Sequence, residues 1–318
     1  MDVGKWASNS RAVIEQYSSV SSELIELKAP TNSPVSVLGL LWTPSTDALH
    51  YHVPAVSTAE ATKRGILSAV AKLYDPLGFL SPVIIRAKIL LQDLWLLGID
   101  WDAKPSEATT QAWREFQEHI VEAQLIRIPR WISLTSTSRW DLHGFCDASQ
   151  KAYAAAVYAV LYDAADNPIG CHLLIAKTKV SPIKVLNIPR LELQGAVLLA
   201  RLVNFVNTSL QQAPLLTYCW TDSNIVLAWL RSHPSRWKTF TANRVSEIHT
   251  LMPNVAWRHV PSKENPSDCA SRGISAKLLI DHALWWHGPT WLLEDPSTWP
   301  SESSQKLPSR EPQYSSPP

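Results

Sequence analysis

The chain contains little cysteine, and what there is shows no ligand spacing. Of its 318 residues only four are cysteines, and they are Cys146, Cys171, Cys219 and Cys269. They lie far apart and form no CxxC pair, which argues against a zinc site or a disulfide framework. This cysteine content fits a reducing intracellular compartment better than an oxidising extracellular one.

Long apolar runs and a strong net charge are also missing. The longest apolar stretch, Ile89 to Ile99, is broken by Gln92 and Asp93, so no membrane span is expected. The opening residues, MDVGKWASNSRAVIEQ, have no apolar core of the signal-peptide kind. The net charge of +1 is lower than that of a strongly basic nucleic-acid binder, although basic residues can still cluster locally.

Tryptophan, by contrast, is abundant. The chain has 15 tryptophans against 2 methionines, and we expect most of them to pack in the core or between domains, with some free to stack on bases or sugars. With 46% hydrophobic and 18% charged residues, the sequence is typical of a globular protein of about two domains.

The first part of the chain predicts a strand hairpin and then helices. Residues 10–17 read as a short helix, and Val35–Trp42 and Leu49–Val53 read as strands joined by a turn at Pro44–Asp47. Thr58 is a candidate cap for a helix over 59–73, and Ser81-Pro82 opens a second helix. A third helix over 107–124 places Trp113, Phe116 and Ile120 on one face.

From Trp140 onward the pattern changes to strands that alternate with helices. The expected strands are 142–146, 153–162, 169–178, 215–221 and 255–260, and the expected helices are 191–210, 223–230 and 240–252. The order β-β-β-α-β-α-α-β predicts an α/β fold, a five-stranded mixed sheet with flanking helices, in which the first three strands form an antiparallel meander. The segment from Pro300 is rich in Ser, Pro, Glu and Gln and predicts a disordered tail.

Four carboxylates lie where these elements begin or end. Asp147 follows the first strand, Glu192 lies in the first turn of the long helix, Asp222 follows the fourth strand and Asp268 opens a short last helix. If the first and fourth strands are neighbours, Asp147 and Asp222 project from the same end of the sheet. A cluster of carboxylates can hold two Mg²⁺ ions, which in turn bind a phosphodiester. Mn²⁺ can bind to the same carboxylate oxygens.

Each carboxylate also has a simpler interpretation. Asp222-Ser223 and Ser267-Asp268 are possible helix N-caps, Asp147 a turn residue, and Glu192 a favourable charge at a helix N-terminus. Taken one by one, these interpretations are at least as good as catalysis. All four carboxylates in the right elements and order favour the metal site.

Several motifs resemble one known family, the BEL/Pao group of long-terminal-repeat retrotransposons. Five stretches resemble the ribonuclease H domain of this group. They are LHGFCDASQKAYAAAVY, IPRLELQGAVLLARL, YCWTDSNIVLAWL, FTANRVSEI and WRHVPSKENPSDCASRG. The upstream segment KRGILSAVAKLYDPLGFLSPVIIRAKILLQDLW, the palm-like VLGLLWTPSTDALHYHV and the downstream LWWHGPTWL are similar to the same polyprotein. The region is also labelled a Pao retrotransposon peptidase family.

The resemblance implies a ribonuclease H-like fold and a division of the chain. Residues 1–57 would be the edge of a reverse-transcriptase palm, 58–138 a helical thumb or connection, 139–275 the ribonuclease H domain, 276–299 a linker towards integrase and 300–318 a disordered tail. It also implies that Asp147, Glu192, Asp222 and Asp268 bind two Mg²⁺ ions and cleave the RNA strand of an RNA–DNA hybrid. The remaining partners would be the palm and integrase of the polyprotein, without a membrane, in the cytoplasm (in a virus-like particle) or in the nucleus.

Basic and aromatic residues supply candidates for hybrid binding. They are Arg190, Arg231, Arg236, Trp237, Lys238, Arg244, Arg258, Lys263 and Arg272, with Phe240 among them. A solvated surface is an equally good interpretation of any single one. Many retroviral relatives carry a histidine in a loop before the last aspartate; here Lys263 is nearer to that position, and His259 is a candidate auxiliary residue or a strand-edge surface residue.

Two other functions remain open. The chain could be a non-catalytic hybrid-binding remnant of a reverse transcriptase, which lacks metal-dependent turnover. An aspartic peptidase would need a D-[ST]-G loop, and the nearest match, Asp222-Ser223-Asn224, has no glycine and leads into a helix. No YxDD-type motif is present, so no polymerase activity is expected.

Overall fold

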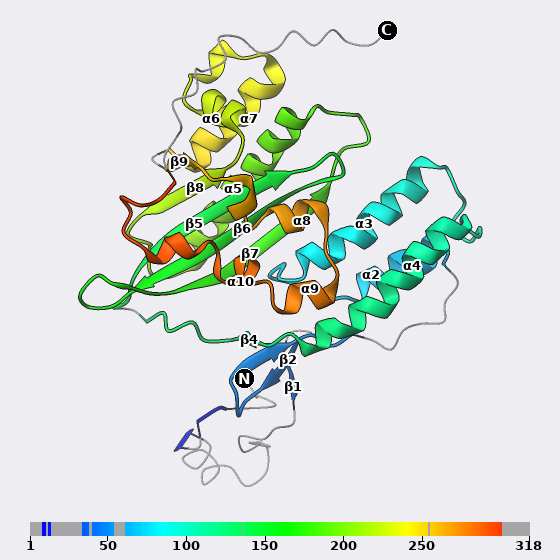
Figure 1. The fold of residues 1–318 in the computed structure, drawn as a ribbon, viewed down its shortest axis with the longest axis horizontal. Helices are drawn as coiled ribbons and strands as arrows, with labels where there is room; N and C mark the ends of the chain where they lie inside the picture. The colour runs from blue at the N-terminus through cyan, green and yellow to red at the C-terminus, as the bar shows by residue number, and fades with distance from the viewer. Residues whose placement is uncertain are drawn as a thin grey trace, which may run out of the picture.

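The structure is a computed structural model that describes residues 8–10, 12–13, 34–37, 40–53, 61–135, 137–253 and 255–300. Most of the helix expected over 10–17, the cap expected at Thr58 and the tail expected after Pro300 lie outside these residues. Figure 1 shows a small sheet, a group of helices beside the edge of a larger sheet, and further helices over that sheet.

The larger sheet has the predicted mixed topology. Its strands are β5 (Arg139–Ala148), β6 (Ala152–Tyr162), β7 (Pro168–Val180), β8 (Thr217–Thr221) and β9 (Ala256–His259). Their order is β7-β6-β5-β8-β9, with β5 to β7 antiparallel and β8 parallel to both β5 and β9. The meander and the adjacency of the first and fourth strands are therefore confirmed.

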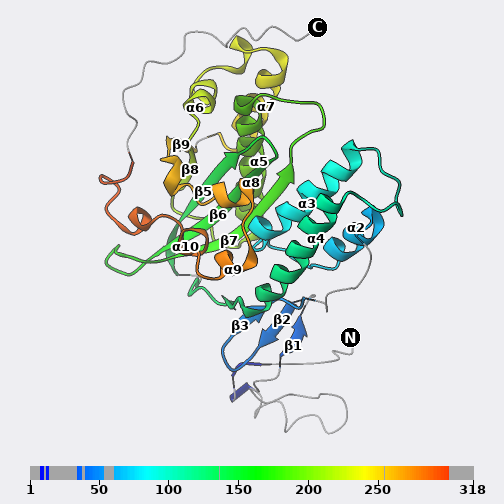
Figure 2. The same cartoon turned by 45° about the vertical axis from the view of Figure 1, so that its right-hand side comes forward.

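Each face of this sheet buries its own layer of residues, because successive side chains on a strand point to opposite faces. On one face, Cys146 and Val157 pack with α5 (Ile188–Ser209), α6 (Asn224–Leu230) and α7 (Thr239–Leu251). On the other face, Phe145 and Tyr158 pack with α8 (Asp268–Arg272) and the segments that follow it. Figure 2 shows α5 and α8 on either side of the strands.

The helical module consists of α2 (Lys63–Ala71), α3 (Ser81–Leu96), α4 (Glu107–Ile120) and the 3₁₀ turn η1 (Val121–Leu125). Its first helix is capped by Thr62, whose hydroxyl accepts from the amide of Gly65 at 3.1 Å, so the helix starts later than the sequence predicted. Trp113, Phe116 and Ile120 are all buried on one face of α4, as predicted.

This module packs directly against the edge strand β7. The amide of Ala176 donates to the carbonyl of Leu77 at 2.8 Å, and Gln92 Nε2 donates to the carbonyl of Ser181 at 2.6 Å. Gly78 has a φ of +74°, and a Cβ there would lie 1.8 Å from the Ala176 oxygen, so only glycine allows this approach. The helices and the sheet therefore share one core.

The small sheet contains the predicted hairpin and two strands the sequence did not reveal. β2 (Leu40–Thr43) and β3 (Ala48–His50) form the hairpin, and β1 (Val35–Val37), expected as part of one strand with β2, pairs with β2 instead. β4 (Ile128–Pro129) adds to β3 from the end of the helical module. It was missed because two residues between arginines give no alternation to detect.

Residues 276–299, expected as a linker, instead fold onto the larger sheet. They form α9 (Ala276–Ile280), α10 (Ala283–His287) and the 3₁₀ turn η4 (Thr290–Leu293), and they bury Trp285, Trp291 and Trp299. Trp285 Nε1 also donates to the carbonyl of Phe79 in the helical module at 3.0 Å. For these tryptophans the packing interpretation is confirmed.

All four cysteines are free and buried. Within the described ranges, no helix combines the length and apolar character needed to cross a membrane.

Candidate active site

Asp147 and Asp222 lie next to each other at one end of the sheet. β5 and β8 run parallel with Cys146 paired to Thr221, so the next residue on each strand is one of the two aspartates. Asp147 is only 5% exposed. The cap interpretation of Asp222 does not hold, because the N-cap of α6 is Ser223, whose hydroxyl accepts from the amide of Val226 at 3.3 Å.

Glu192 approaches this point from α5. That helix begins after the cap Asn187, which places Glu192 in its second turn rather than in the predicted first turn. One turn further, a Cβ on Gly195 would lie 3.1 Å from the backbone oxygen of Asp147, so the helix runs close to the end of β5. Residues three apart share a helix face, and Glu192 is therefore turned towards the same end of the sheet.

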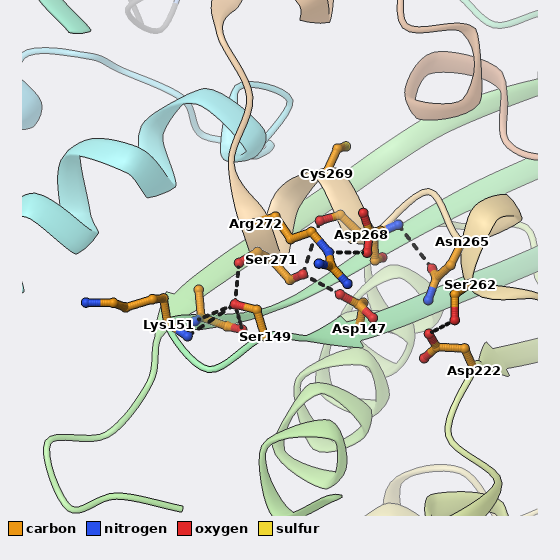
Figure 3. Close-up of polar contacts among 12 residues, drawn as sticks. Asp147, Ser149, Lys151, Asp222, Ser262, Asn265, Asp268, Cys269, Ser271 and Arg272 are labelled. Carbon is orange, nitrogen blue, oxygen red and sulfur yellow. Dashed lines mark hydrogen bonds and ion pairs between the residues drawn. The ribbon is translucent and has the colours of Figure 1, made fainter. Parts of the chain in front are cut away.

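Asp268 is carried by α8, which buried polar side chains tie to β5. Asn265 Nδ2 donates to the carbonyl of Cys146 and Ser267 Oγ to the carbonyl of Phe145, both at 2.9 Å. Ser271 Oγ donates to Asp147 Oδ2, which joins the far end of the helix to the aspartate itself (Figure 3). Ser267 makes no side-chain cap, contrary to the simpler interpretation of Ser267-Asp268.

Each of the four carboxylates accepts a hydrogen bond from a close neighbour. Ser262 Oγ donates to Asp222 Oδ2 at 2.6 Å, and Arg272 Nε donates to Asp268 Oδ1 at 2.5 Å. Ser223 Oγ donates to Glu192 Oε2 in the same way. These contacts could not be found from the sequence. Only the fold shows that Asn265, Ser267 and Ser271 turn inward and that Ser223 and Ser262 reach the carboxylates.

Burial and mutual repulsion perturb two of the carboxylates strongly. Burial, with the nearby charges of Asp222 and Asp268, raises the pKa of Asp147 to about 6, although the Ser271 hydroxyl opposes the shift. Burial, with the charges of Asp222 and Asp147, raises the pKa of Glu192 to about 7. Asp222 and Asp268 thus lie within electrostatic reach of Asp147, and Glu192 lies within reach of Asp147 and Asp222.

The chemistry of the donor set fits divalent cations, whereas the present side-chain arrangement is not a finished coordination sphere. Asp222 Oδ1 is buried and has no hydrogen-bond partner in the described part of the chain, so a carboxylate oxygen is left for another ligand. Among those same residues, no three His, Cys, Asp or Glu side chains converge as metal ligands.

His259 lies on the edge strand β9, beside the end of β8 that leads to Asp222. It pairs with Thr221 across β8 and β9, which puts it on the face of the sheet that carries Cys146 and α5 rather than α8. Lys263 is exposed on the 3₁₀ turn η3 (Ser262–Glu264), whose first residue binds Asp222.

The remaining basic candidates fall into two groups. Around α6 and α7, Arg231, Arg236 and Lys238 are exposed, while the guanidinium carbons of Arg190 and Arg244 lie 5.1 and 3.5 Å from the ring centre of Phe240. The second group is Lys263 and Arg272, which lie close together in the sequence. Arg272 is exposed but is already paired with Asp268. These positions leave a hybrid-binding role open for both groups.

Two of the candidates contribute mainly to packing. Trp237 is half-buried; its Nε1 donates to the carbonyl of Trp229 at 3.2 Å, and the two rings lie edge to face. Arg258 lies over Tyr218, Trp220 and Trp299, with its guanidinium carbon 5.0 to 5.9 Å from their ring centres. Both side chains are only partly exposed.

The mixed five-stranded sheet with helices on both faces and the carboxylates at one end has the ribonuclease H-like architecture. The profile of one family, described as the Pao retrotransposon-like RNaseH-like domain, matches residues 62–223. This match spans just over half of the chain, so the chain belongs to that family. The match includes Asp147, Glu192 and Asp222 and ends before Asp268.

Solved structures of ribonucleases H resemble the chain at low identity. The N-terminal RNase H domain of Rv2228c from Mycobacterium tuberculosis aligns with 42% of this chain and 94% of its own, at 14% identity and a TM-score of 0.28. LC11-RNase H1 in complex with RNA/DNA hybrid, isolated from compost, aligns with 46% and 99%, at 13% identity and a TM-score of 0.29.

A viral polymerase structure aligns with more of the chain. The foamy viral protease-reverse transcriptase in complex with double-stranded DNA aligns with 72% of this chain and 38% of its own, at 15% identity and a TM-score of 0.28. No curated protein matches the sequence. The family assignment rests on the profile match.

Proposed function

We propose that this chain is a metal-dependent ribonuclease H that cleaves the RNA strand of RNA–DNA hybrids. The observation that carries the proposal is the gathering of Asp147, Glu192, Asp222 and Asp268 at one end of the sheet, with a buried oxygen on Asp222 that has no partner among the described residues. Repulsion among carboxylates that are this close is relieved most simply by cations.

The position of each of the four carboxylates would determine its role in metal binding. Asp147 is buried and lies within reach of the charges of Asp222 and Asp268. Glu192 lies within reach of the charges of Asp147 and Asp222. Asp147 and Asp222 are therefore the ligands best placed to bind both metal ions. Two Mg²⁺ ions bound there would activate a water and stabilise the departing 3′ oxygen. Arg272, already beside Asp268, is placed to balance charge at the outer side.

The partners follow from the family. We propose that the substrate is an RNA–DNA hybrid and that the reverse-transcriptase palm and integrase of the same polyprotein are the neighbours in the chain. Intracellular localisation, in virus-like particles or the nucleus, is part of the same proposal.

One observation favours a second candidate, a hybrid-binding module without turnover. Each carboxylate is held by its own serine or arginine donor, and no three metal-ligand side chains converge within the described residues. A site that never leaves this arrangement would bind the hybrid and fail to cleave it. Nothing observed favours a peptidase, since Asp222-Ser223-Asn224 leads directly into α6.

The test is cleavage of an end-labelled RNA–DNA hybrid with Mg²⁺, with Mn²⁺ and with EDTA. We expect metal-dependent cuts in the RNA strand only, and no cuts in single-stranded RNA or in double-stranded DNA of the same sequence. Hybrid binding without cleavage under every metal condition would support the binding module instead.

A further inference from the structure

A groove outside the candidate active site runs along the edge of β7. It has a volume of about 770 Å³ and is lined by parts of α3, β7, α5 and the turn at Leu77 and Gly78. Its apolar lining includes Leu73, Leu198 and Leu202. None of the candidate nucleic-acid-binding residues of the sequence analysis lies in it.

The groove carries an excess of positive charge. The groove is lined by Lys88, Lys177, Lys179 and Arg201. Among the residues that the structure describes, Arg201 alone of these four is in an ion pair, with Glu247 at 2.6 Å. Lys88 and Lys177 lie close enough to repel each other, and Lys177 and Lys179 are exposed. Within the described residues, Lys177 and Lys179 therefore have unused capacity for an anion, whereas the charge of Lys88 is partly balanced by nearby Asp75.

The single acidic residue in the lining does not offset this excess. Asp75 is buried and accepts from Tyr51 Oη at 2.7 Å and from the amide of Leu80 at 3.0 Å, so both of its oxygens are occupied. Burial raises its pKa to about 6, so Asp75 is still mostly ionised at neutral pH, but its one negative charge is outnumbered by the four cations of the lining.

An aromatic side chain completes the lining. Phe205, on α5, is 53% exposed, which is unusual for a phenylalanine on a helix that otherwise buries its apolar residues. A basic groove with an exposed aromatic ring is the arrangement by which proteins hold single-stranded nucleic acid, with phosphates on the cations and a base on the ring.

The groove also lies close to the candidate active site. Thr178, between the two exposed lysines, donates to the carbonyl of Ala270 in α8 at 2.9 Å, and α8 carries Asp268. In register, Asp147 pairs with Ala154 and Ala154 with Thr178, so two strand spacings, about 10 Å, separate Asp147 from this point. A strand that leaves the site could continue into the groove.

We propose that this groove binds a single strand of nucleic acid, with its phosphates on Lys88, Lys177 and Lys179 and a base stacked on Phe205. The choice of nucleic acid over an acidic protein segment rests on the proposed function of the adjacent site, whose substrate is a polyanion. The binding itself requires no cleavage.

The experiment measures the anisotropy of a fluorescent oligodeoxythymidylate of about a dozen nucleotides in EDTA, over a range of salt concentrations. The variants are Lys177→Glu with Lys179→Glu, and Phe205→Ala. Lys104→Glu with Lys277→Glu is the matched control, because it makes the same charge change at exposed lysines outside the groove.

We expect the groove pair to lose at least about tenfold in affinity, and its log–log salt slope to fall by about 1.4, the value for two lost phosphate contacts. Phe205→Ala should lose roughly fivefold or more, and the control pair less than about threefold. Lys177→Gln with Lys179→Gln, which is milder for folding, should change affinity in the same direction.

Equal losses in the groove and control pairs, or unchanged binding in the groove pair, would overturn the proposal. Retained oligonucleotide binding with selective loss of binding to an acidic peptide would assign the groove to a protein partner. The groove variants should still cleave a short hybrid with the kcat of the unmodified chain. Absence of any cleavage would contradict the proposed function and leave this binding result standing.

Discussion

Serine hydroxyls hold three of the four carboxylates of the candidate site, and this is its most specific feature at the scale of single residues. Ser271 is fully buried and binds both Asp147 Oδ2 and the carbonyl of Asp268, so it joins the two elements that meet there. The sequence could predict the carboxylates from their positions after strands. It could not predict Ser271, because a serine three residues after an aspartate is equally common on a surface.

Ser271→Ala should lower hybrid cleavage about tenfold or more. The change removes a hydrogen bond to a buried carboxylate, an interaction of roughly 1.5–3 kcal/mol, and leaves Asp147 less well oriented. The measurement is kcat and KM on the hybrid at saturating Mg²⁺. Ser246→Ala, at an exposed position of α7, is the control, and an equal effect of both substitutions would show that Ser271 has no special role.

The raised pKa values predict an unusual pH dependence of stability in the metal-free protein. The folded-state pKa of Asp147, about 6, and of Glu192, about 7, exceed the ordinary values of 3.8 and 4.5. The folded state therefore binds more protons than the unfolded state between these limits, and stability falls as pH rises.

Urea denaturation in EDTA from pH 5 to pH 8 measures this effect. We expect the free energy of unfolding to fall by an amount on the order of 3 kcal/mol across the range, and Mg²⁺ to restore much of it at pH 8. Asp147→Asn with Glu192→Gln should flatten the profile. A slope that persists in this double variant would assign the dependence to other groups.

At the scale of elements, close backbone approaches at glycines position the helices. Gly195 lets α5 approach the end of β5, and Gly78 lets the α2–α3 turn pair with β7. The sequence predicted most of the helices and the strands of the larger sheet from their patterns, but it predicted a linker where α9 and α10 lie. It could not predict β4 or the docking of the helical module, since both depend on contacts between segments distant in the chain.

Gly78→Ala should destabilise the fold more than Gly98→Ala. Both glycines have positive φ, +74° and +65°, so both substitutions carry the strain of the left-handed region, about 1 kcal/mol or more. Only at Gly78 would the new Cβ also lie 1.8 Å from a backbone oxygen, whereas nothing lies within 4 Å at Gly98. Equal shifts of the urea midpoint would contradict the docking of the module on β7.

At the scale of the whole molecule, the helical module, the larger sheet and residues 276–299 are built around one core. Trp285 is fully buried, and its Nε1 reaches Phe79 across 206 positions of the chain. The high tryptophan content indicated packing in general. The sequence does not predict which segments each tryptophan packs against, because a large apolar ring can pack against any apolar segment that the fold brings near it.

Trp285→Ala should cost about 3–5 kcal/mol of unfolding free energy, the range for a large aromatic residue removed from a core. Trp131→Ala, at a position 60% exposed, should change it by less than about 0.5 kcal/mol. Thermal or urea unfolding measures both. A small loss at Trp285 would mean that residues 276–299 contribute little to the fold.

The most direct test of the central claim compares Asp222→Asn with Asp281→Asn in hybrid cleavage and in hybrid binding. Asp222 supplies the unpartnered oxygen beside Asp147, whereas Asp281 lies outside the site, after α9. We expect Asp222→Asn to abolish Mg²⁺-dependent cleavage while the affinity for the hybrid stays within about threefold. We expect Asp281→Asn to leave both cleavage and binding unchanged. Undiminished cleavage by Asp222→Asn would contradict a metal site built on these carboxylates.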